Sequence, residues 1–347
     1  MMDLDINNNK DFKVIAKDQQ SICMSLVHEA LRHVQSQGIH VDTLLQRAGI
    51  ATELLTSHQA RVSIYQYGNL WVEIANAMND EFFGMDSRPL RRGSFQFLTK
   101  MLIHCDNLEQ ALQDALRFFN LLLDDLKGEL IQQDGIAKIM IHDQQQTKPI
   151  FSYACYWMLL HSLMCWLSGQ RIRLVSMQVK AAMPAAHQDY QTRFCSDIRY
   201  HSNQHALAFD ASYLKLPIKQ DLASRHQFLQ GTPYNLLVRF KNPYALSQQI
   251  RQQLLNLAPQ DWLDLSELAH RLHISEATLQ RRLKAEGFSY QQLKNNIRRD
   301  RAIALLMNSN QSLQQISDSL NFHDPSAFHR AFKKWTGLNP SHYRTKG

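Results

Sequence analysis

The chain has 347 residues, of which 44 % are hydrophobic, and it carries a formal net charge of +7. This length exceeds one typical domain, so we expect two, and the apolar share is enough for buried cores. An odd number of widely spaced cysteines without a Cys-x-x-Cys pair argues against a disulfide framework or a zinc site and favours reduced thiols. They are Cys23, Cys105, Cys155, Cys165 and Cys195.

Residues 1–20 are polar and begin Asp3-Leu4-Asp5, without the basic and then apolar pattern of a signal peptide. We therefore expect a cytoplasmic protein whose first 20 residues are disordered or flexible.

From 21 to 126 apolar residues recur at intervals of three and four, which predicts helices. The clearest are Ile22–Gln35, Tyr65–Met78, Phe95–Ile103 and Leu108–Leu123. The period then changes, and residues 129–131 and 136–141 on either side of Asp134-Gly135 predict a hairpin. Further strands are expected at 171–180, 198–201 and 206–209, so residues 21–217 should form an α+β domain.

The most apolar run extends from Phe151 to Leu167. It spans 17 residues, contains His161 and several small polar side chains, and lies between two candidate sheet segments. These features fit a core helix better than a membrane span, so we expect no membrane partner.

Catalytic motifs are absent from the sequence. It has no Gly-rich phosphate loop, no Gly-x-Ser-x-Gly elbow, no His-Glu-x-x-His and no dinucleotide fingerprint. His201 and His205 are four residues apart, but their flanks are strand-like, which favours ordinary histidines over metal ligands. We therefore expect neither an enzyme nor a metal or cofactor site.

Residues 218–243 contain turn-forming residues and are predicted to be the linker. A helix over Tyr244–Leu257 then opens a second, all-α domain at 244–347. Within it a unit occurs twice, at about 261–287 and 312–337. Leu279, Arg281, Leu283 and Lys284 reappear 49 residues later as Phe328, Arg330, Phe332 and Lys333.

Each copy reads as two short helices joined by a tight turn. Ser275 is a strong N-cap for the second helix of the first copy, and Asp324 followed by Pro325 serves the second copy. Apolar residues line one face of these helices and basic residues the other, which is the helix-turn-helix layout. A longer helix over Ser289–Met307 is expected to join the two units and fix their separation.

The positive charge is concentrated in this part of the chain. From Lys241 to the end there are 15 basic and 8 acidic residues, a surplus that equals the whole formal charge of +7. The rest of the chain is neutral, so the second domain alone has the electrostatic character of a nucleic-acid binder.

The stretch from Ile316 to Arg344, with its Ala327-Phe328-His329-Arg330-Ala331-Phe332 core, resembles the signature region of AraC/XylS-type bacterial transcription regulators. Two positions depart from the usual pattern, Ser317 for Ala and Asn321 for Gly. Asn tolerates a left-handed conformation better than other non-glycine residues, so the turn should survive.

Residues 21–216 resemble, more loosely, the sensor domain of the ornithine-utilisation and VirS-like branch of that family. Arg61, Asp80-Glu81-Phe82-Phe83-Gly84 and His205-Ala206-Leu207-Ala208-Phe209 carry part of this likeness. The resemblance implies a domain that binds a small-molecule effector and dimerises.

The resemblance also implies the contact residues. The positions matching the family's base-facing sites are Ala277, Gln280, Arg281, Ser326, Ala327, His329 and Arg330. Gln can pair bidentately with adenine and Arg with guanine. The positions expected to meet phosphates are Thr278, Lys284, Lys333 and Lys334.

The sequence thus predicts a transcription regulator, usually an activator in this family, that binds double-stranded DNA as a homodimer, works with RNA polymerase and responds to a small-molecule effector. Two alternatives remain: a DNA-binding regulator controlled by abundance or pH, and an enzyme with an appended DNA-binding module. Arg61, Arg92 and Lys100 could serve an anionic ligand, but as surface or capping charges they do not define an effector site.

Overall fold

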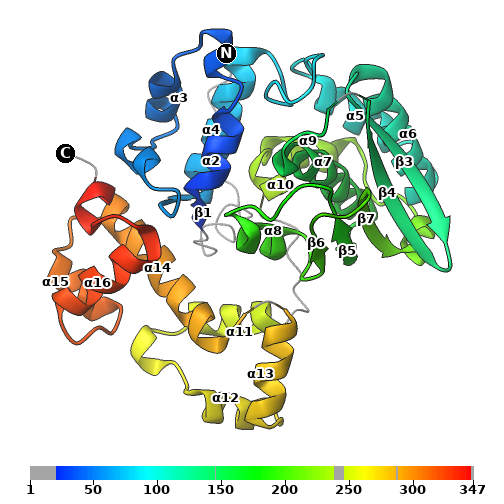
Figure 1. Ribbon diagram of the computed structural model, residues 1–347. Helices are drawn as coiled ribbons and strands as arrows, with labels where there is room; N and C mark the ends of the chain where they lie inside the picture. The colour runs from blue at the N-terminus through cyan, green and yellow to red at the C-terminus, as the bar shows by residue number, and fades with distance from the viewer. Residues whose placement is uncertain (1–20, 145, 238–245, 287, 345–347) are drawn as a thin grey trace. The chain divides into compact units, whose positions relative to one another are not determined.

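The computed structural model describes residues 21–344 except 145, 238–245 and 287 (Figure 1). The chain divides into two compact units. Unit 1 comprises Met1–Ile22, Glu53–Ile64 and Pro243–Gly347, and unit 2 comprises Cys23–Thr52 and Tyr65–Asn242. The predicted flexible tail at 1–20 lies outside the described residues.

Unit 2 is built on a five-stranded sheet in the order β3-β4-β7-β5-β6. The strands are β3 (Leu126–Gln133), β4 (Ile136–Asp143), β5 (Leu174–Gln178), β6 (Ile198–Arg199) and β7 (His205–Asp210). All neighbours are antiparallel except β5 and β6. Asp134 and Gly135 close the predicted hairpin with φ of 52° and 77°, which confirms the Asp-Gly turn.

Helix α7 (Ile150–Ser168) is the core of unit 2, as its sequence predicts. It is long and apolar enough to cross a membrane, yet every one of its residues is buried within the fold. Trp157 Nε1 donates to the Ile139 carbonyl of β4 at 3.2 Å, and the Tyr153 ring stacks on His205 of β7 at 3.7 Å. Helix α6 (Leu108–Leu122) packs against β3 and α7, partly through Phe119 and Tyr156. The result is an α+β unit, which confirms the predicted fold class.

Unit 2 contains further α-helices besides α6 and α7. They are α2 (Met24–Leu31), α3 (Val41–Arg47), α4 (Ile64–Met78), α5 (Ser94–Leu102), α8 (His187–Arg193), α9 (Leu222–Gln230) and α10 (Tyr234–Leu237). The helix predicted from Ile22 begins only at Met24, because Ile22 lies in a strand instead.

Helices α9 and α10 lie inside the segment predicted as a linker. Asp221 and Ser224 form a capping box at the start of α9, and the Phe228 ring stacks on Trp166 of α7 with centroids 4.5 Å apart. These contacts attach residues 222–237 to unit 2, so less of the predicted linker is free to join the units. Residues 238–243 lie outside the described residues.

The C-terminal part of unit 1 is all-α, as predicted. Its helices are α11 (Leu246–Leu255), α12 (Leu265–Arg271), α13 (Glu276–Ala285), α14 (Tyr290–Asn308), α15 (Leu313–Ser319) and α16 (Pro325–Thr336), followed by the short 3-10 helix η5 (Pro340–Tyr343). The carboxylate of Glu286 accepts the backbone N–H groups of Leu246 and Ser247 and so caps α11.

Unit 1 also contains pieces from early in the chain, which its sequence did not indicate. Strands β1 (Ser21–Cys23) and β2 (Arg61–Ser63) pair, and the 3-10 helix η2 (Thr52–Thr56) precedes β2. Ser21 Oγ donates to Asp300 of α14, Ser57 Oγ donates to the Thr336 carbonyl at 3.0 Å, and Arg61 N donates to Tyr343 Oη at 2.9 Å. Residues about 280 positions apart in sequence thus share one unit.

Candidate nucleic-acid interface

The first helix pair, α12 and α13, has the predicted caps and turn. Asp264 and Glu267 form a capping box at the start of α12, and Ser275 Oγ accepts from Thr278 N at the start of α13. His273 turns the chain between the two helices with φ of +55°. Few non-glycine residues adopt this conformation, because it is strained. The packing of the two helices offsets this strain.

The second pair, α15 and α16, repeats the arrangement. Asp324 accepts from Ala327 N at 2.7 Å, and Pro325 occupies the first turn of α16, as predicted. Asn321 has φ of +57° and stands 48 residues after His273, so the two copies turn at equivalent places. The left-handed conformation expected for Asn321 is confirmed.

Both second helices bury one face and expose the other. Leu279 and Leu283 of α13 and Phe328 and Phe332 of α16 are completely buried. The predicted contact residues that are exposed are Ala277, Gln280, Arg281, Lys284, Ser326, Arg330, Lys333 and Lys334. Thr278, Ala327 and His329 are half-buried. The Thr278 hydroxyl also accepts a hydrogen bond from Ser275 Oγ at 2.9 Å, which ties it to the helix cap.

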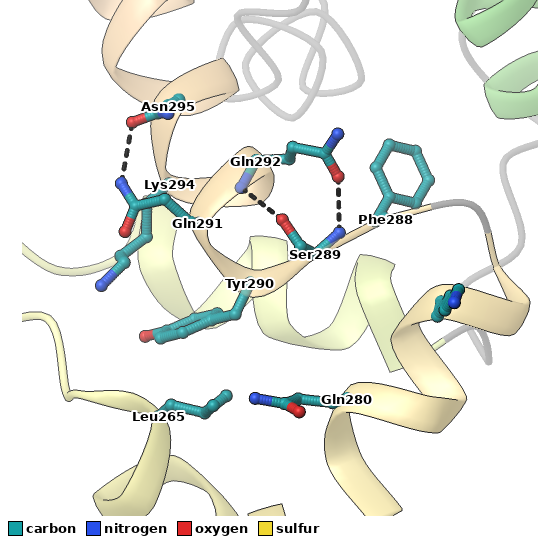
Figure 2. A pocket seen from close by; sticks show the side chains of 10 residues that line it. Leu265, Gln280, Phe288, Ser289, Tyr290, Gln291, Gln292, Lys294 and Asn295 are labelled. Carbon is teal, nitrogen blue, oxygen red and sulfur yellow. Dashed lines mark hydrogen bonds between the residues drawn. The ribbon is translucent and has the colours of Figure 1, made fainter. Parts of the chain in front are cut away.

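A pocket of about 810 Å³ opens beside α13 (Figure 2). Gln280 and Lys284 of α13 line it together with Leu265 and the first turns of α14. Lys294 lines it as well, with Nζ 4.6 Å from the centre of the Tyr290 ring. Burial and the charge of Arg298 lower the pKa of Lys294. Sequence reasoning did not single out Lys294, because its helix was assigned only a packing role.

Arg298 of α14 connects the two helix pairs. Its guanidinium lies 5.1 Å from the Trp262 ring, just before α12, and 5.6 Å from the Phe322 ring, just before α16. Its Nε donates to the Leu320 carbonyl at 3.1 Å. Burial lowers its pKa. Helix α14 therefore holds both pairs by specific contacts, as expected of a joining helix.

The N-terminal candidates for an anionic ligand belong to different units. Arg61 belongs to unit 1, where its Nε donates to Ser21 Oγ at 2.7 Å, whereas Arg92 and Lys100 are exposed residues of unit 2. His201 lies in a turn with φ of +51° and His205 in β7, so no helix places these two histidines on one face.

Two consecutive helix-turn-helix pairs, each with a buried apolar face and an exposed basic face on its second helix, define a helix-turn-helix DNA-binding protein. Comparison with known families makes this assignment specific. Residues 38–218 match the arabinose-binding domain of AraC transcription regulators, and residues 268–346 match a helix-turn-helix domain. The chain belongs to the AraC-type transcription regulators.

Similar proteins are transcription regulators and not enzymes. The ornithine utilization regulator of Pseudomonas aeruginosa is 27 % identical over 314 residues, which cover 90 % of this chain and 92 % of that protein. The regulator VqsM of the same organism is 30 % identical over 45 % of this chain and 48 % of its own length. The virulence regulon transcriptional activator VirF of Shigella flexneri is 30 % identical over 28 % of this chain and 37 % of its own length.

Proposed function

We propose that α13 and α16 enter major-groove segments of a promoter and that Gln280, Arg281, His329 and Arg330 read base edges there. The observation that carries this proposal is the duplicated helix pair, whose second helices bury an apolar face and leave Gln280, Arg281 and Arg330 exposed and His329 half-buried. Ala277, Ser326 and Ala327 face the same groove, where small side chains allow close approach or contact a thymine methyl group.

Lys284, Lys333 and Lys334 then meet phosphates and set the salt dependence of binding. Thr278 lies at the start of α13, where a hydroxyl can reach the phosphate backbone. Lys294 shares the pocket of Lys284 and is the further phosphate contact that we add to this set.

Binding of the full chain to promoter fragments tests this proposal by fluorescence anisotropy across a salt series. Lys284→Ala and Lys333→Ala should each weaken binding to all sequences and lower the salt slope by about 0.9. Lys100→Ala is the matched control, since Lys100 is an exposed lysine of unit 2. Equal slopes for all three variants would remove the phosphate roles.

We further propose that unit 2 binds a small metabolite and forms a homodimer, and that the dimer activates transcription together with RNA polymerase. The match of residues 38–218 to an arabinose-binding domain supports the metabolite, and the name of VirF supports activation. A ligand controls such a protein only if it binds one arrangement more tightly than the other.

A thermal-shift screen of the full chain against amino acids, sugars, fatty acids and other carboxylates tests effector control. Ligand at about 100 times its dissociation constant stabilises the native state by about 2.7 kcal/mol. A blank panel with a strong pH dependence would favour the alternative in which abundance or pH controls the regulator. Analytical ultracentrifugation tests the homodimer separately.

A further inference from the structure

Two half-buried arginines of unit 2 have guanidinium nitrogens that are buried and lack a counter-charge among the described residues. Arg171 lies between α7 and β5, and Arg193 is the last residue of α8. Nε and Nη1 of Arg171 and Nε of Arg193 are buried and donate to no acceptor among the residues that the structure describes. Among the described residues, neither guanidinium forms an ion pair with a carboxylate.

The groups around them do not supply the missing negative charge. Arg193 Nη2 donates to Ser162 Oγ at 2.9 Å, which is a neutral partner. The nearby thiols of Cys165 and Cys195 stay protonated, because burial raises their pKa to about 11 and about 12. The charge of Arg171 contributes to lowering the pKa of Arg193, so the two guanidinium groups are near each other.

His161 completes this cluster without adding charge. Its Nε2 lies 2.9 Å from the Ile172 carbonyl, which can only accept, so Nε2 carries the proton and donates. Its Nδ1 is buried and has no hydrogen-bond partner among the described residues. Burial lowers the pKa of His161 to about 3, so the ring is neutral and Nδ1 is an acceptor.

Such an arrangement costs stability unless something else pairs with it. Buried charges in folded proteins are paired. A buried donor without an acceptor loses its hydrogen bonds to water and gains none in the protein, which costs stability. Burial lowers the pKa of both arginines to about 10, so both remain charged at neutral pH. Two half-buried cations whose buried nitrogens have no partner among the described residues are therefore better explained by a ligand than by packing.

We propose that Arg171 and Arg193 bind the carboxylate of the small metabolite that unit 2 senses, an inference that rests on the effector control proposed above. Guanidinium N–H groups form charge-assisted hydrogen bonds to a carboxylate, and the free donors here are Nε and Nη1 of Arg171 and Nε of Arg193. Because the free donor atoms are buried, the ligand is small and not a macromolecule. The acceptor Nδ1 of His161 suits a hydroxyl or ammonium group on the same metabolite.

Thermal shift of the full chain with acetate, lactate, alanine and succinate tests the proposal, with acetamide as the uncharged analogue and phosphate and sulfate as inorganic oxyanions. At least one carboxylate should raise the melting temperature, and acetamide should not. This response should disappear in Arg171→Met and Arg193→Met. It should persist in Arg173→Met, because Arg173 is exposed two residues from Arg171.

The proposal is overturned if no carboxylate stabilises the protein, if only phosphate or sulfate does, or if the two Met variants respond as the wild type does.

A second measurement distinguishes loss of ligand binding from misfolding of the variants. Arg193→Lys keeps the charge and loses the free Nε donor, so it should fold and show a weaker response. In the absence of ligand, both Met variants should be at least as stable as the wild type, because they remove an unmatched buried cation. A large loss of stability would assign the arginines a packing role instead.

DNA binding by the same full chain separates this inference from the proposed function. A carboxylate that binds through Arg171 and Arg193 but leaves the affinity for DNA unchanged upholds the site and contradicts effector control. A metabolite that changes DNA affinity equally in the wild type and in Arg193→Met upholds effector control and contradicts the site.

Discussion

Arg281 is the residue on which the proposed sequence reading by α13 most depends. It is exposed on the face opposite the buried Leu279 and Leu283. Arg281→Ala should cost about 1–3 kcal/mol of specific binding and relax the preference for one base pair. Binding of the variant to a library of single-base operator changes measures this loss. Uniform weakening at every position, as expected for Lys284→Ala, would show that Arg281 contacts phosphate instead.

His161 should make the stability of unit 2 depend on pH. Its folded pKa of about 3 lies below the ordinary value of 6.5 because the ring is completely buried. Below pH 6.5, His161 therefore binds a proton in the unfolded chain but stays neutral in the folded chain. The contribution of the neutral ring is complete above pH 6.5 and falls by about 1.4 kcal/mol per unit as the pH drops toward the folded pKa.

Urea denaturation between pH 7.5 and pH 5 measures this effect. His161→Gln should flatten the pH dependence, whereas His226→Gln, at an exposed position of α9, should leave it as in the wild type. A pH dependence that survives in His161→Gln would have to come from other groups.

Individual residues were predictable where the chemistry is local. Ser275, Asp324 and Asn321 have the predicted roles because caps and left-handed turns depend on a few neighbouring residues. Arg171 and Arg193 gave no signal, because the burial of their guanidinium groups is decided by tertiary packing. The roles of the predicted DNA-contacting residues remain predictions.

The turn inside each helix pair is the element with the most specific backbone requirement. Asn321 has φ of +57°, a conformation that costs a β-branched residue about 1–2 kcal/mol. Asn321→Val should lower the stability of unit 1 by about this amount, whereas Asn321→Gly should be nearly neutral. Thermal denaturation followed by circular dichroism compares the two. Equal stability of both variants would show that the turn changes its conformation.

Helix α14 contacts the surroundings of both helix pairs through Arg298. Arg298→Met removes the hydrogen bond to Leu320 and the ring contacts with Trp262 and Phe322. We expect a loss of about 1–3 kcal/mol in stability. Binding to DNA that carries both half-sites should weaken more than binding to either half alone. Arg271→Met, an exposed position at the end of α12, is the control.

At the scale of elements, regular patterns were predictable and exceptions were not. The hairpin β3–β4, the core helix α7 and the duplicated helix pairs follow from periodicity and repetition. Strand β1 was mistaken for the start of a helix because Ile22 continues an apolar pattern whose backbone partner, β2, lies far along the chain. Helix α9 was missed because it buries only Phe228 among its nine residues.

At the scale of the whole molecule, the net charge is distributed unevenly along the chain. The surplus of positive charge lies from Lys241 onward, in the part that carries the helix pairs, and the remainder is neutral. This separation was predictable because charge is a property of composition. The division into units was harder to predict, because unit 1 also includes Glu53–Ile64.

A fragment of residues 240–347 should therefore be less stable than the same residues in the full chain. It lacks Ser21, Ser57 and Arg61, which hydrogen-bond to Asp300, Thr336 and Tyr343. Hydrogen exchange at α14 and η5 should be faster in the fragment. Equal protection in both would show that the early segments contribute nothing to the unit.

The contacts between early and late segments of unit 1 also constrain the order in which the two units can fold during synthesis. Synthesis of unit 2 is complete once residue 242 has been added. Unit 1 cannot be completed until residues 243–347 have been made. Arg61 and Tyr343 are 282 residues apart. At about 5–20 residues per second, the strand at Arg61 exists for roughly 14–56 s before Tyr343 is made. During that interval the nascent protein can complete its N-terminal fold while the part that would hold a promoter is still unfinished.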